Sequence, residues 1–252
     1  MKQLVLSLFP GIGLLDRAFE LEGFQVLRGP DPIWGGDIRR FHVEPGLFPG
    51  IIGGPPCQEF SQLSHLVRHN GLTPKWGNLI PEYERVVGEA KPAWFLMENV
   101  RQAPLPAVEG YVVRDYLLNN RWVGGTQHRV RRFSFGTRDG RELDISPDLV
   151  IFEAADFQWS VYAGHGPSPS QRDKIRMQAN RRHLSGKNVL PRDKSGALVP
   201  LVIMLELQGL PKDFLDNCPF TMNGKKAGVA NGVPQAIGRA LARAVKRAMM
   251  GE

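Results

Sequence analysis

One cysteine of this chain stands in a setting that favours chemistry over packing. Cys57 follows a run of glycines and prolines, GGPPCQ at residues 53–58, which ends a short apolar strand. Such a run predicts a rigid turn at the carboxyl edge of a sheet, where ligands bind in open α/β folds. A thiol presented there can have a lowered pKa and act as a nucleophile. A lone cysteine is more often a small buried apolar residue, but a cysteine in that role does not need a rigid turn of glycines and prolines before it. Cys218 does not follow such a turn, and we interpret it as structural.

A carboxylate closes another apolar strand. The sequence WFLMENV at residues 94–100 predicts a buried strand that ends at Glu98. Burial at such a position can raise the pKa of the carboxyl group and suit it to a catalytic role. Asn99 is equally suited to capping a helix, so this segment alone leaves a catalytic and a structural interpretation open.

Two arginines alternate in the run QHRVRR at residues 127–132. Because side chains alternate along a strand, Arg129 and Arg131 should point to one face. Paired guanidinium groups can hold a phosphate or the carbonyl of a base. A basic edge strand that discourages aggregation is the competing interpretation.

A glycine-rich turn, FPGIG at residues 9–13, lies between the first predicted strand and the first predicted helix. Its glycines let a ligand approach the backbone, and the helix that follows can receive a carboxylate or phosphate at its amino terminus. Asp16 stands where the dinucleotide fingerprint has its last glycine. NAD is therefore disfavoured, whereas a nucleoside cofactor with an amino-acid tail remains compatible.

An α/β sheet is needed to position these groups. The first half of the 252-residue chain alternates short apolar runs with helical patterns, as βα-type proteins do. The patterns predict strands at residues 4–9, 24–28, 50–53, 93–97 and 132–136, helices at 14–21 and 83–89, and a carboxyl-terminal helix over about 237–248. In the first helix we expect Leu21 to face inward with Leu14 and Phe19. The arginines of the last helix, Arg239, Arg243 and Arg247, favour a solvated face over a DNA-binding one.

Composition changes after about residue 140. Residues 141–198 combine Gly, Pro, Ser and basic residues with weak periodicity. This predicts a small irregular lobe beside a catalytic and cofactor-binding domain formed by residues 1–140 and 199–252. The basic lobe and the net charge of +7 fit either a solvated loop or a phosphate-contacting surface. No apolar run is long enough to span a membrane, and the two cysteines suit a reducing cytoplasm.

In this order the motifs resemble those of the DNA cytosine-5 methyltransferases. The segment FPGIG resembles the F-x-G-x-G cofactor motif of that family, PPCQ its P-C-Q nucleophile motif, and ENV its E-N-V motif. Later segments are similar to its Q-x-R-x-R, R-L-Q-G-F-P and N-x-V motifs, namely QHRVR at 127–131, LELQGLP at 205–211 and NGV at 231–233. The resemblance covers residues 4 to about 248. Leu14 and Ser7 depart from it, because a glycine and an acidic residue are usual there.

The resemblance implies a Rossmann-like fold that uses S-adenosyl-L-methionine, with no metal. The cofactor-binding residues that it implies are Phe9, Gly11, Ile12, Gly13, Asp31, Trp34, Asp37, Ile38, Leu79, Asn231 and Val233. Among these, Asp31 is expected to bind the ribose and Trp34 to stack on the adenine. Asp37 is expected to contact the adenine amino group.

The resemblance also implies a mechanism. Cys57 adds to C6 of cytosine and makes C5 nucleophilic, Glu98 binds N3 and the exocyclic amine, and Arg131 holds the O2 edge with support from Arg129. The base must leave the DNA stack, and residues 61–76 are expected to close over it as a mobile loop. Residues 141–198 would then recognise the target sequence.

The expected partner is double-stranded DNA, and a cytoplasmic monomer without membrane or obligate protein partner is expected. Methylation of tRNA cytosine is an alternative, but that subgroup carries a Cys-Phe-Thr segment, which the sequence CPFT at residues 218–221 matches only loosely. A catalytically inactive homologue is a second alternative. Such proteins typically lose the nucleophile or the E-N-V carboxylate, and here both Cys57 and Glu98 are present.

Overall fold

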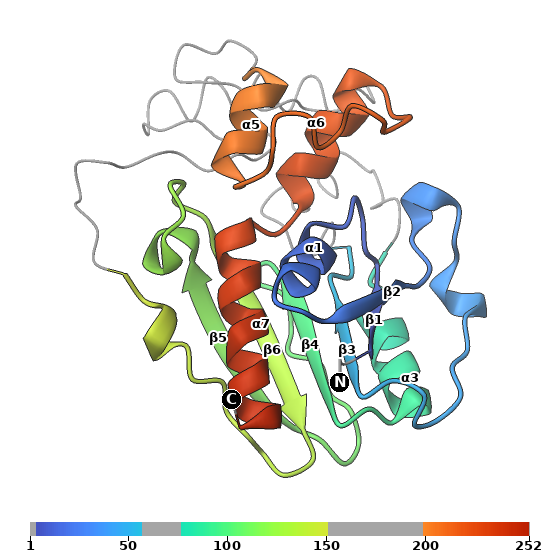
Figure 1. Ribbon diagram of the computed structural model, residues 1–252. Coiled ribbons are helices and arrows are strands. Elements are labelled where there is room, and N and C mark those ends of the chain that lie inside the picture. The colour runs from blue at the N-terminus through green and yellow to red at the C-terminus, as the bar shows by residue number, and fades with distance from the viewer. Residues whose placement is uncertain (1–3, 57–76, 151–198, 252) are drawn as a thin grey trace.

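The computed structural model describes residues 4–56, 77–150 and 199–251 (Figure 1). The helices of these segments are α1 (Leu14–Leu21), α3 (Ile80–Ala90), α5 (Leu201–Leu207), α6 (Met222–Asn231) and α7 (Gln235–Met250). The strands are β1 (Leu4–Leu8), β2 (Gln25–Arg28), β3 (Gly50–Gly53), β4 (Trp94–Asn99), β5 (Val112–Asn119) and β6 (Val130–Thr137). Short 3-10 helices occur at η1 (Pro32–Trp34), η2 (Ile38–Arg40), η3 (Asn120–Val123) and η4 (Ser146–Asp148).

The strands of the described residues form one mixed sheet in the order β2-β1-β3-β4-β6-β5. The first four in this order are parallel, and β6 runs antiparallel between β4 and β5. The strand after β1 in the sequence, β2, lies on one side of β1, and the next strand, β3, lies on the other side of β1. This reversal creates a crevice at the carboxyl ends of β1 and β3, where open α/β sheets bind ligands.

Alternating side chains of the parallel strands feed two separate cores. Val5, Ile52 and Leu96 pack with residues of α1 and α7 on one face, which is the near face in Figure 1. Their sequence neighbours, Leu6, Ile51 and Phe95 among them, pack with residues of α3 on the other face. The sheet is thus covered on both sides, which explains why the central parallel strands β1, β3 and β4 are largely apolar.

A third core lies beyond the carboxyl edge of the parallel strands. Leu205 of α5 and Val229 of α6 pack there with Leu14 of α1. In Figure 1, α5 and α6 lie above the sheet at the end towards which β4 runs. These two helices therefore cover the crevice at the carboxyl ends of β1 and β3.

The expected strands and helices that fall in the described residues are confirmed, with boundaries shifted by one to three residues. Leu21 was expected to face inward, but it is 51% exposed because it lies in the last turn of α1 away from α7. Neither β5 nor α6 was expected. Residues 230–234 were read as a loop before the last helix, whereas α6 continues to Asn231.

The first part of the predicted lobe contacts α7. Leu143 and Ile145 are buried in the core shared with α7, and Asp148 pairs with Arg243 and Arg247 of that helix. The division expected at residue 141 stays a prediction. Residues 151–198 lie outside the described residues.

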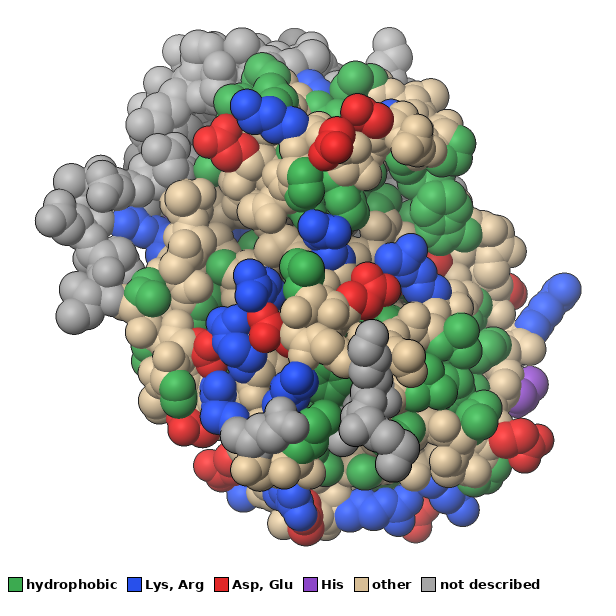
Figure 2. Space-filling model, viewed as in Figure 1, with side chains coloured by type: hydrophobic (Ala, Val, Ile, Leu, Met, Phe, Trp, Pro, Cys, Tyr) green, Lys and Arg blue, Asp and Glu red, His purple; other side chains and the backbone are tan. Residues whose placement is uncertain are grey.

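The arginines of α7 also have intramolecular partners. Arg239 and Arg243 both pair with Glu22, which follows α1. Figure 2 shows basic and acidic side chains adjoining one another over α7. These arginines hold α7 to the rest of the fold, so the face expected to be simply solvated is a network of ion pairs. In the described segments, no helix is both long and apolar enough to cross a membrane.

Candidate active site

A cavity of about 500 Å³ opens at the crevice predicted by the strand order. Its walls include Phe9 after β1, Gly53 and Gly54 at the end of β3, and Glu98 at the end of β4. Residues of α6 complete it on the side away from the sheet. The volume is in the usual range for a small-molecule site, and one cavity joins the predicted cofactor turn to the predicted catalytic carboxylate.

The glycine turn depends on backbone conformations that favour glycine. Gly11 and Gly13 have φ values of 59° and 80°, in the left-handed region. A Cβ atom placed on Gly11 would meet nothing within 4 Å, so its Cα faces open space. Phe9 shares a positive φ of 55° and lines the cavity. The turn therefore presents bare backbone and one aromatic ring to a ligand.

The peptide groups of Gly11 are held from both ends by the segment after β2. The Gly11 N–H donates to Oδ2 of Asp31 at 2.8 Å, and the Nε1–H of Trp34 donates to the Gly11 carbonyl at 2.7 Å. Asp31 also accepts from the backbone of Ile33. Asp31 and Ile33 line the cavity, whereas Trp34 is 52% exposed and stacks on Phe220. Asp31 and Trp34, both predicted cofactor residues, thus also fix the shape of the turn.

Glu98 and Arg131 form the predicted catalytic pair. They reach the cavity from adjacent antiparallel strands, and Nε of Arg131 lies 3.0 Å from Oε1 of Glu98. Burial raises the pKa of the Glu98 carboxyl group above its usual range, and the guanidinium groups of Arg131 and Arg129 offset this only in part. The site therefore holds a carboxyl group that takes up a proton more readily than a solvated one.

The nucleophile predicted from sequence, Cys57, lies outside the described residues, as does the expected loop at 61–76. The segment leading to it is described as far as Pro56, and both Pro55 and Pro56 line the cavity. Asn99 is buried, and its Nδ2 donates to the carbonyl of Pro55 at 3.3 Å. Asn99 therefore connects the strand end that carries Glu98 to the segment that precedes Cys57. Cys218 is half-buried and not disulfide-bonded.

Arg129 has a different position from its neighbour Arg131. It is only 1% exposed, and its Nη2 donates to the carbonyl oxygens of Ala230 and Gly232 at 2.7 and 3.1 Å. Those carbonyls flank Asn231, which lines the cavity together with Val233. Arg129 is thus a positioning residue for the end of α6, besides its electrostatic effect on Glu98.

Three glutamines that sequence reasoning missed extend this anchoring. Gln127 donates to Gln208, and Gln208 donates to the carbonyls of Val229 and Gly232. Gln235 receives no motif assignment either, yet it donates to the carbonyl of Leu14 at the start of α1. The only signal in the sequence was that Gln127 and Gln208 fall inside the segments QHRVR and LELQGLP.

Five predicted cofactor residues lie outside the lining of the cavity as the described residues form it, and Trp34 is one of them. Ile38 and Leu79 are buried in the core that also contains Phe9, and Asp37 caps the short helix η2 through the backbone N–H of Arg39. Gly13 is also absent from the lining; a Cβ placed there would clash with the guanidinium of Arg28. Their roles in cofactor binding stay predictions.

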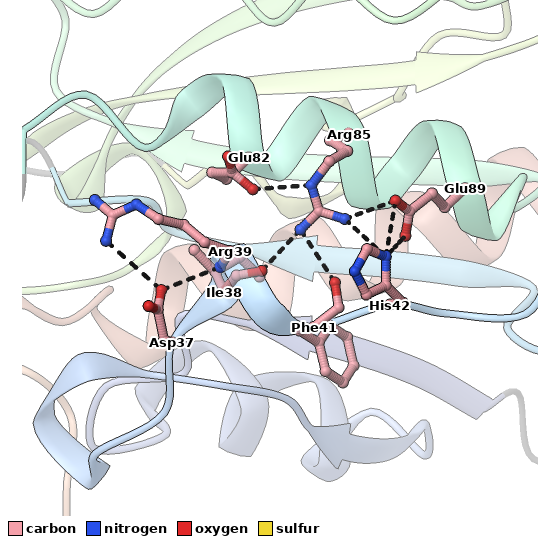
Figure 3. Close-up of polar contacts among 8 residues, drawn as sticks. All are labelled: Asp37, Ile38, Arg39, Phe41, His42, Glu82, Arg85 and Glu89. Atoms are coloured by element: carbon pink, nitrogen blue, oxygen red, sulfur yellow. Dashed lines mark hydrogen bonds and ion pairs between the residues drawn. The ribbon is translucent and has the colours of Figure 1, made fainter.

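Arg85 of α3 holds the segment that carries Asp37 and Ile38 (Figure 3). Its Nη2 donates to the carbonyls of Ile38 and Phe41 at 2.8 and 3.0 Å. The same guanidinium pairs with two carboxylates of its own helix, at 2.9 Å to Glu82 and 2.6 Å to Glu89. The loop after β2 is therefore anchored to the helix that covers the far face of the sheet.

Ser7 stands where the resembled family usually has an acidic residue, and a buried carboxylate of α1, that of Asp16, lies beside it. The Ser7 hydroxyl donates to Oδ1 of Asp16 at 2.5 Å, and Nε of Arg28 donates to Oδ2 at 2.9 Å. Burial raises the pKa of Asp16, and both hydrogen bonds oppose this effect. Ser7 and Asp16 both line the cavity. An acidic group is thus present beside the end of β1, although it comes from α1.

Comparison with known proteins identifies the family. The family model for C-5 cytosine-specific DNA methylases matches residues 32–195. The chain is 32% identical over 173 residues to the type II methyltransferase M.NgoPII of Neisseria gonorrhoeae, covering 56% of this chain and 50% of that protein. It is 34% identical over 171 residues to M.FnuDI of Fusobacterium nucleatum, covering 56% and 48%. The chain thus matches about half the length of these curated relatives.

Solved structures share the fold over nearly the full chain. Dnmt2 methyltransferase of S. pombe superimposes with a TM-score of 0.61 at 12% identity, covering 97% of this chain and 99% of that one. The methyltransferase EhMeth of Entamoeba histolytica superimposes with a TM-score of 0.59 at 13% identity, covering 98% of each chain. The α/β methyltransferase fold is therefore confirmed, and the match to the family model extends over more than half of the sequence. The chain belongs to the family of C-5 cytosine-specific DNA methylases.

Proposed function

We propose that this protein transfers a methyl group from S-adenosyl-L-methionine to C5 of a flipped-out cytosine in double-stranded DNA, with Cys57 as the nucleophile. The observation that carries the proposal is the single cavity lined by both the glycine turn and the Glu98–Arg131 pair. A methyl donor and a base must meet in one enclosed space for direct transfer, and this cavity lies where the sheet topology favours ligand binding.

The charges of the cavity suit this cofactor. Apart from the Glu98–Arg131 pair, its described lining carries two acidic side chains, Asp16 and Asp31. S-adenosyl-L-methionine carries a sulfonium and an ammonium group, so a negative surrounding favours its binding. We assign the amino-acid tail to the turn at Phe9–Gly13 and to Asn231, and the ribose to Asp31. Each carboxylate oxygen of Asp31 retains a second lone pair that can accept from a hydroxyl.

The cofactor supplies an electrophilic methyl group when bound. On the protein side, the Cys57 thiolate adds to C6 of the cytosine ring, and the electron pair of the C5–C6 double bond becomes available at C5. Glu98, whose pKa is raised by burial, donates a proton to N3 as negative charge develops there. Arg131 orients Glu98 and binds the O2 edge. After methyl transfer, loss of the C5 proton supplies the electron pair that re-forms the C5–C6 double bond and expels Cys57 as a thiolate, and N3 returns its proton to Glu98.

The base must leave the duplex before Cys57 can reach C6, because stacking covers that atom. We propose that residues 61–76 close over the base and that residues 141–198 read the surrounding sequence. In the same proposal, residues 1–140 and 199–252 form the catalytic and cofactor-binding body, on which residues 143–148 pack through α7. We further propose that the protein acts as a cytoplasmic monomer.

Methyl transfer to unmethylated genomic DNA from labelled S-adenosyl-L-methionine tests the reaction. We expect labelled 5-methylcytosine among the nucleosides after digestion. Cys57→Ala should abolish the label, and Cys218→Ala, which removes the other cysteine, should retain it. Label in N4-methylcytosine, or activity in Cys57→Ala, would contradict the proposed chemistry. Label in tRNA but not in DNA would contradict the proposed substrate.

Covalent trapping tests the role of Cys57 directly. Fluorine at C5 cannot leave as a proton does, so a duplex containing 5-fluorocytosine should remain bonded to the protein after methyl transfer. We expect a denaturation-resistant adduct whose mass equals protein plus methylated DNA, and a peptide map that places it on Cys57. An active enzyme that forms no adduct would rule out Cys57 as the nucleophile.

A further inference from the structure

Phe220 is an aromatic residue at the cavity to which none of the predicted cofactor motifs assigns a role; it lies in the segment CPFT at residues 218–221. It precedes α6, whose first turn is capped by the side chain of Thr221 accepting from the Gly224 N–H at 3.2 Å. A Cβ on Gly224 would lie 3.1 Å from the Phe220 Cβ. The small residue at position 224 thus leaves room for the Phe220 side chain, which lines the cavity.

The ring of Phe220 is oriented by Trp34. The two ring centroids lie 4.7 Å apart with an angle of 30° between the planes, which is a stacked arrangement. Trp34 is itself fixed, since its indole N–H donates to the Gly11 carbonyl at 2.7 Å. A continuous set of contacts therefore runs from the glycine turn through Trp34 to Phe220 at the start of α6.

Phe220 lines the same cavity as Asp31, which we assign to the ribose of the cofactor. Asp31, Pro32 and Ile33 line the same cavity on the side of the segment after β2, and Ala227 and Gly228 line it on α6. This surrounding is apolar and aromatic except for the Asp31 carboxylate. Flat aromatic ligands such as purines bind well to surfaces of this composition.

We infer that Phe220 is a binding residue for the adenine of the cofactor, presented by α6 and oriented by its stack on Trp34. The inference rests on the proposed function and extends it to a residue outside the predicted cofactor motifs. The carboxyl-terminal part of the chain would then contact both halves of the cofactor. Phe220 would contact the nucleoside, and Asn231 and Val233 would contact the amino-acid tail.

The test is calorimetric titration of the full-length protein, without DNA, with S-adenosyl-L-homocysteine and separately with adenosine. Phe220→Leu keeps an apolar side chain but removes the ring, and we expect Kd for both ligands to rise about 2- to 12-fold, the range of a lost aromatic contact. Phe220→Tyr keeps the ring and should bind like the wild type. Phe214→Leu is the matched control, because Phe214 packs in the α5–α6 core and is absent from the cavity lining.

A structural role alone would give a different result. Phe220→Leu and Phe214→Leu would then lower Tm without a selective change in Kd, and that outcome overturns the inference. Should Phe220→Leu fail to fold, intrinsic fluorescence decides. S-adenosyl-L-homocysteine should change the emission of the wild type but not of Trp34→Phe, and equal changes in both proteins overturn the inference. A wild-type protein that binds neither ligand overturns the proposed function as well, whereas unchanged Kd in Phe220→Leu overturns only the inference.

Discussion

The Nε atom of Arg131 lies 3.0 Å from Oε1 of Glu98, across two antiparallel strands whose register pairs Glu98 with Phe133. The arginine is therefore two residues along β6 and reaches back over the strand end. A Cβ on Gly54 would lie 3.3 Å from the other carboxylate oxygen, Oε2. The ion pair and the glycine segment before Cys57 thus enclose the carboxyl group, whose pKa is raised by burial.

The raised pKa of Glu98 predicts how stability changes with pH. A carboxyl group with a higher pKa in the folded than in the unfolded state stabilises the fold below the unfolded pKa, and this contribution is lost as pH rises through the folded pKa. We expect Glu98→Gln, which has no titrating group, to gain stability relative to the wild type as pH rises from about 4 to 8. Urea unfolding across this range measures the difference. Methyl transfer should fall about 100-fold or more, as for loss of a general acid.

An exposed carboxylate provides the control for this pH dependence. Glu44 lies on the surface, and Glu44→Gln is the matched change of an exposed carboxylate to an amide. The attraction between Arg131 and Glu98 requires the ionised carboxylate, so its loss in Glu98→Gln is part of the pH-dependent difference, and the slope is the diagnostic quantity. A slope equal to that of Glu44→Gln would contradict a raised pKa at Glu98.

The hydrogen bond from Asn99 to Pro55 predicts a defect in the covalent step. Asn99→Ala removes the donor that holds the Pro55 carbonyl, and stability should fall by about 1 to 3 kcal/mol. Asn120→Ala is a matched variant, because Asn120 is also buried and donates to a backbone carbonyl, that of Gln127. Both changes should destabilise the protein, but only Asn99→Ala should slow adduct formation with 5-fluorocytosine DNA in a single turnover. Equal adduct rates would show that Asn99 does not position the Cys57 segment.

The features that sequence predicted best are those set by neighbouring residues. Alternating apolar runs identified the parallel strands, and Glu98 was placed at a strand end because WFLMEN is a short apolar run that stops there. The glycine turn was also predicted from local sequence, because the left-handed backbone at Gly11 favours glycine and the sequence shows glycine there.

The features that sequence missed depend on distant residues. Helix α6 contains two glycines and no clear apolar face, so its periodicity gave no signal. It needs a glycine at position 228, because a Cβ there would lie 2.8 Å from Cγ2 of Ile12. Arg129 was read as a catalytic group beside Arg131, yet its partners lie about a hundred residues away, at Ala230 and Gly232. Such contacts leave no local pattern, because tertiary packing overrides intrinsic propensity.

The burial of Arg129 predicts an effect on cofactor affinity. Arg129→Lys keeps the charge but cannot reproduce the planar donor that reaches both Ala230 and Gly232. We expect a loss of about 2 kcal/mol in stability and a rise in Kd for S-adenosyl-L-homocysteine. Arg132→Lys on β6 is the comparison, because Arg132 bonds to the Ala103 carbonyl instead. A matching rise in Kd for both variants would remove the special role of Arg129.

The Arg85 network predicts that the loop after β2 can be loosened from α3. Arg85→Met leaves the carbonyls of Ile38 and Phe41 without their donor, and Glu82→Gln removes only one acidic partner of that arginine while leaving both of those bonds in place. Because the guanidinium is 28% exposed, water can replace part of what is lost, so stability should fall by only about 1 kcal/mol. Hydrogen exchange measured by mass spectrometry should show faster exchange over residues 36–42 in Arg85→Met than in Glu82→Gln.

If Asp37 contacts the adenine, Kd for S-adenosyl-L-homocysteine should rise in Arg85→Met alone. Faster exchange without a change in Kd would separate the anchoring of this loop from cofactor binding and contradict the role predicted for Asp37.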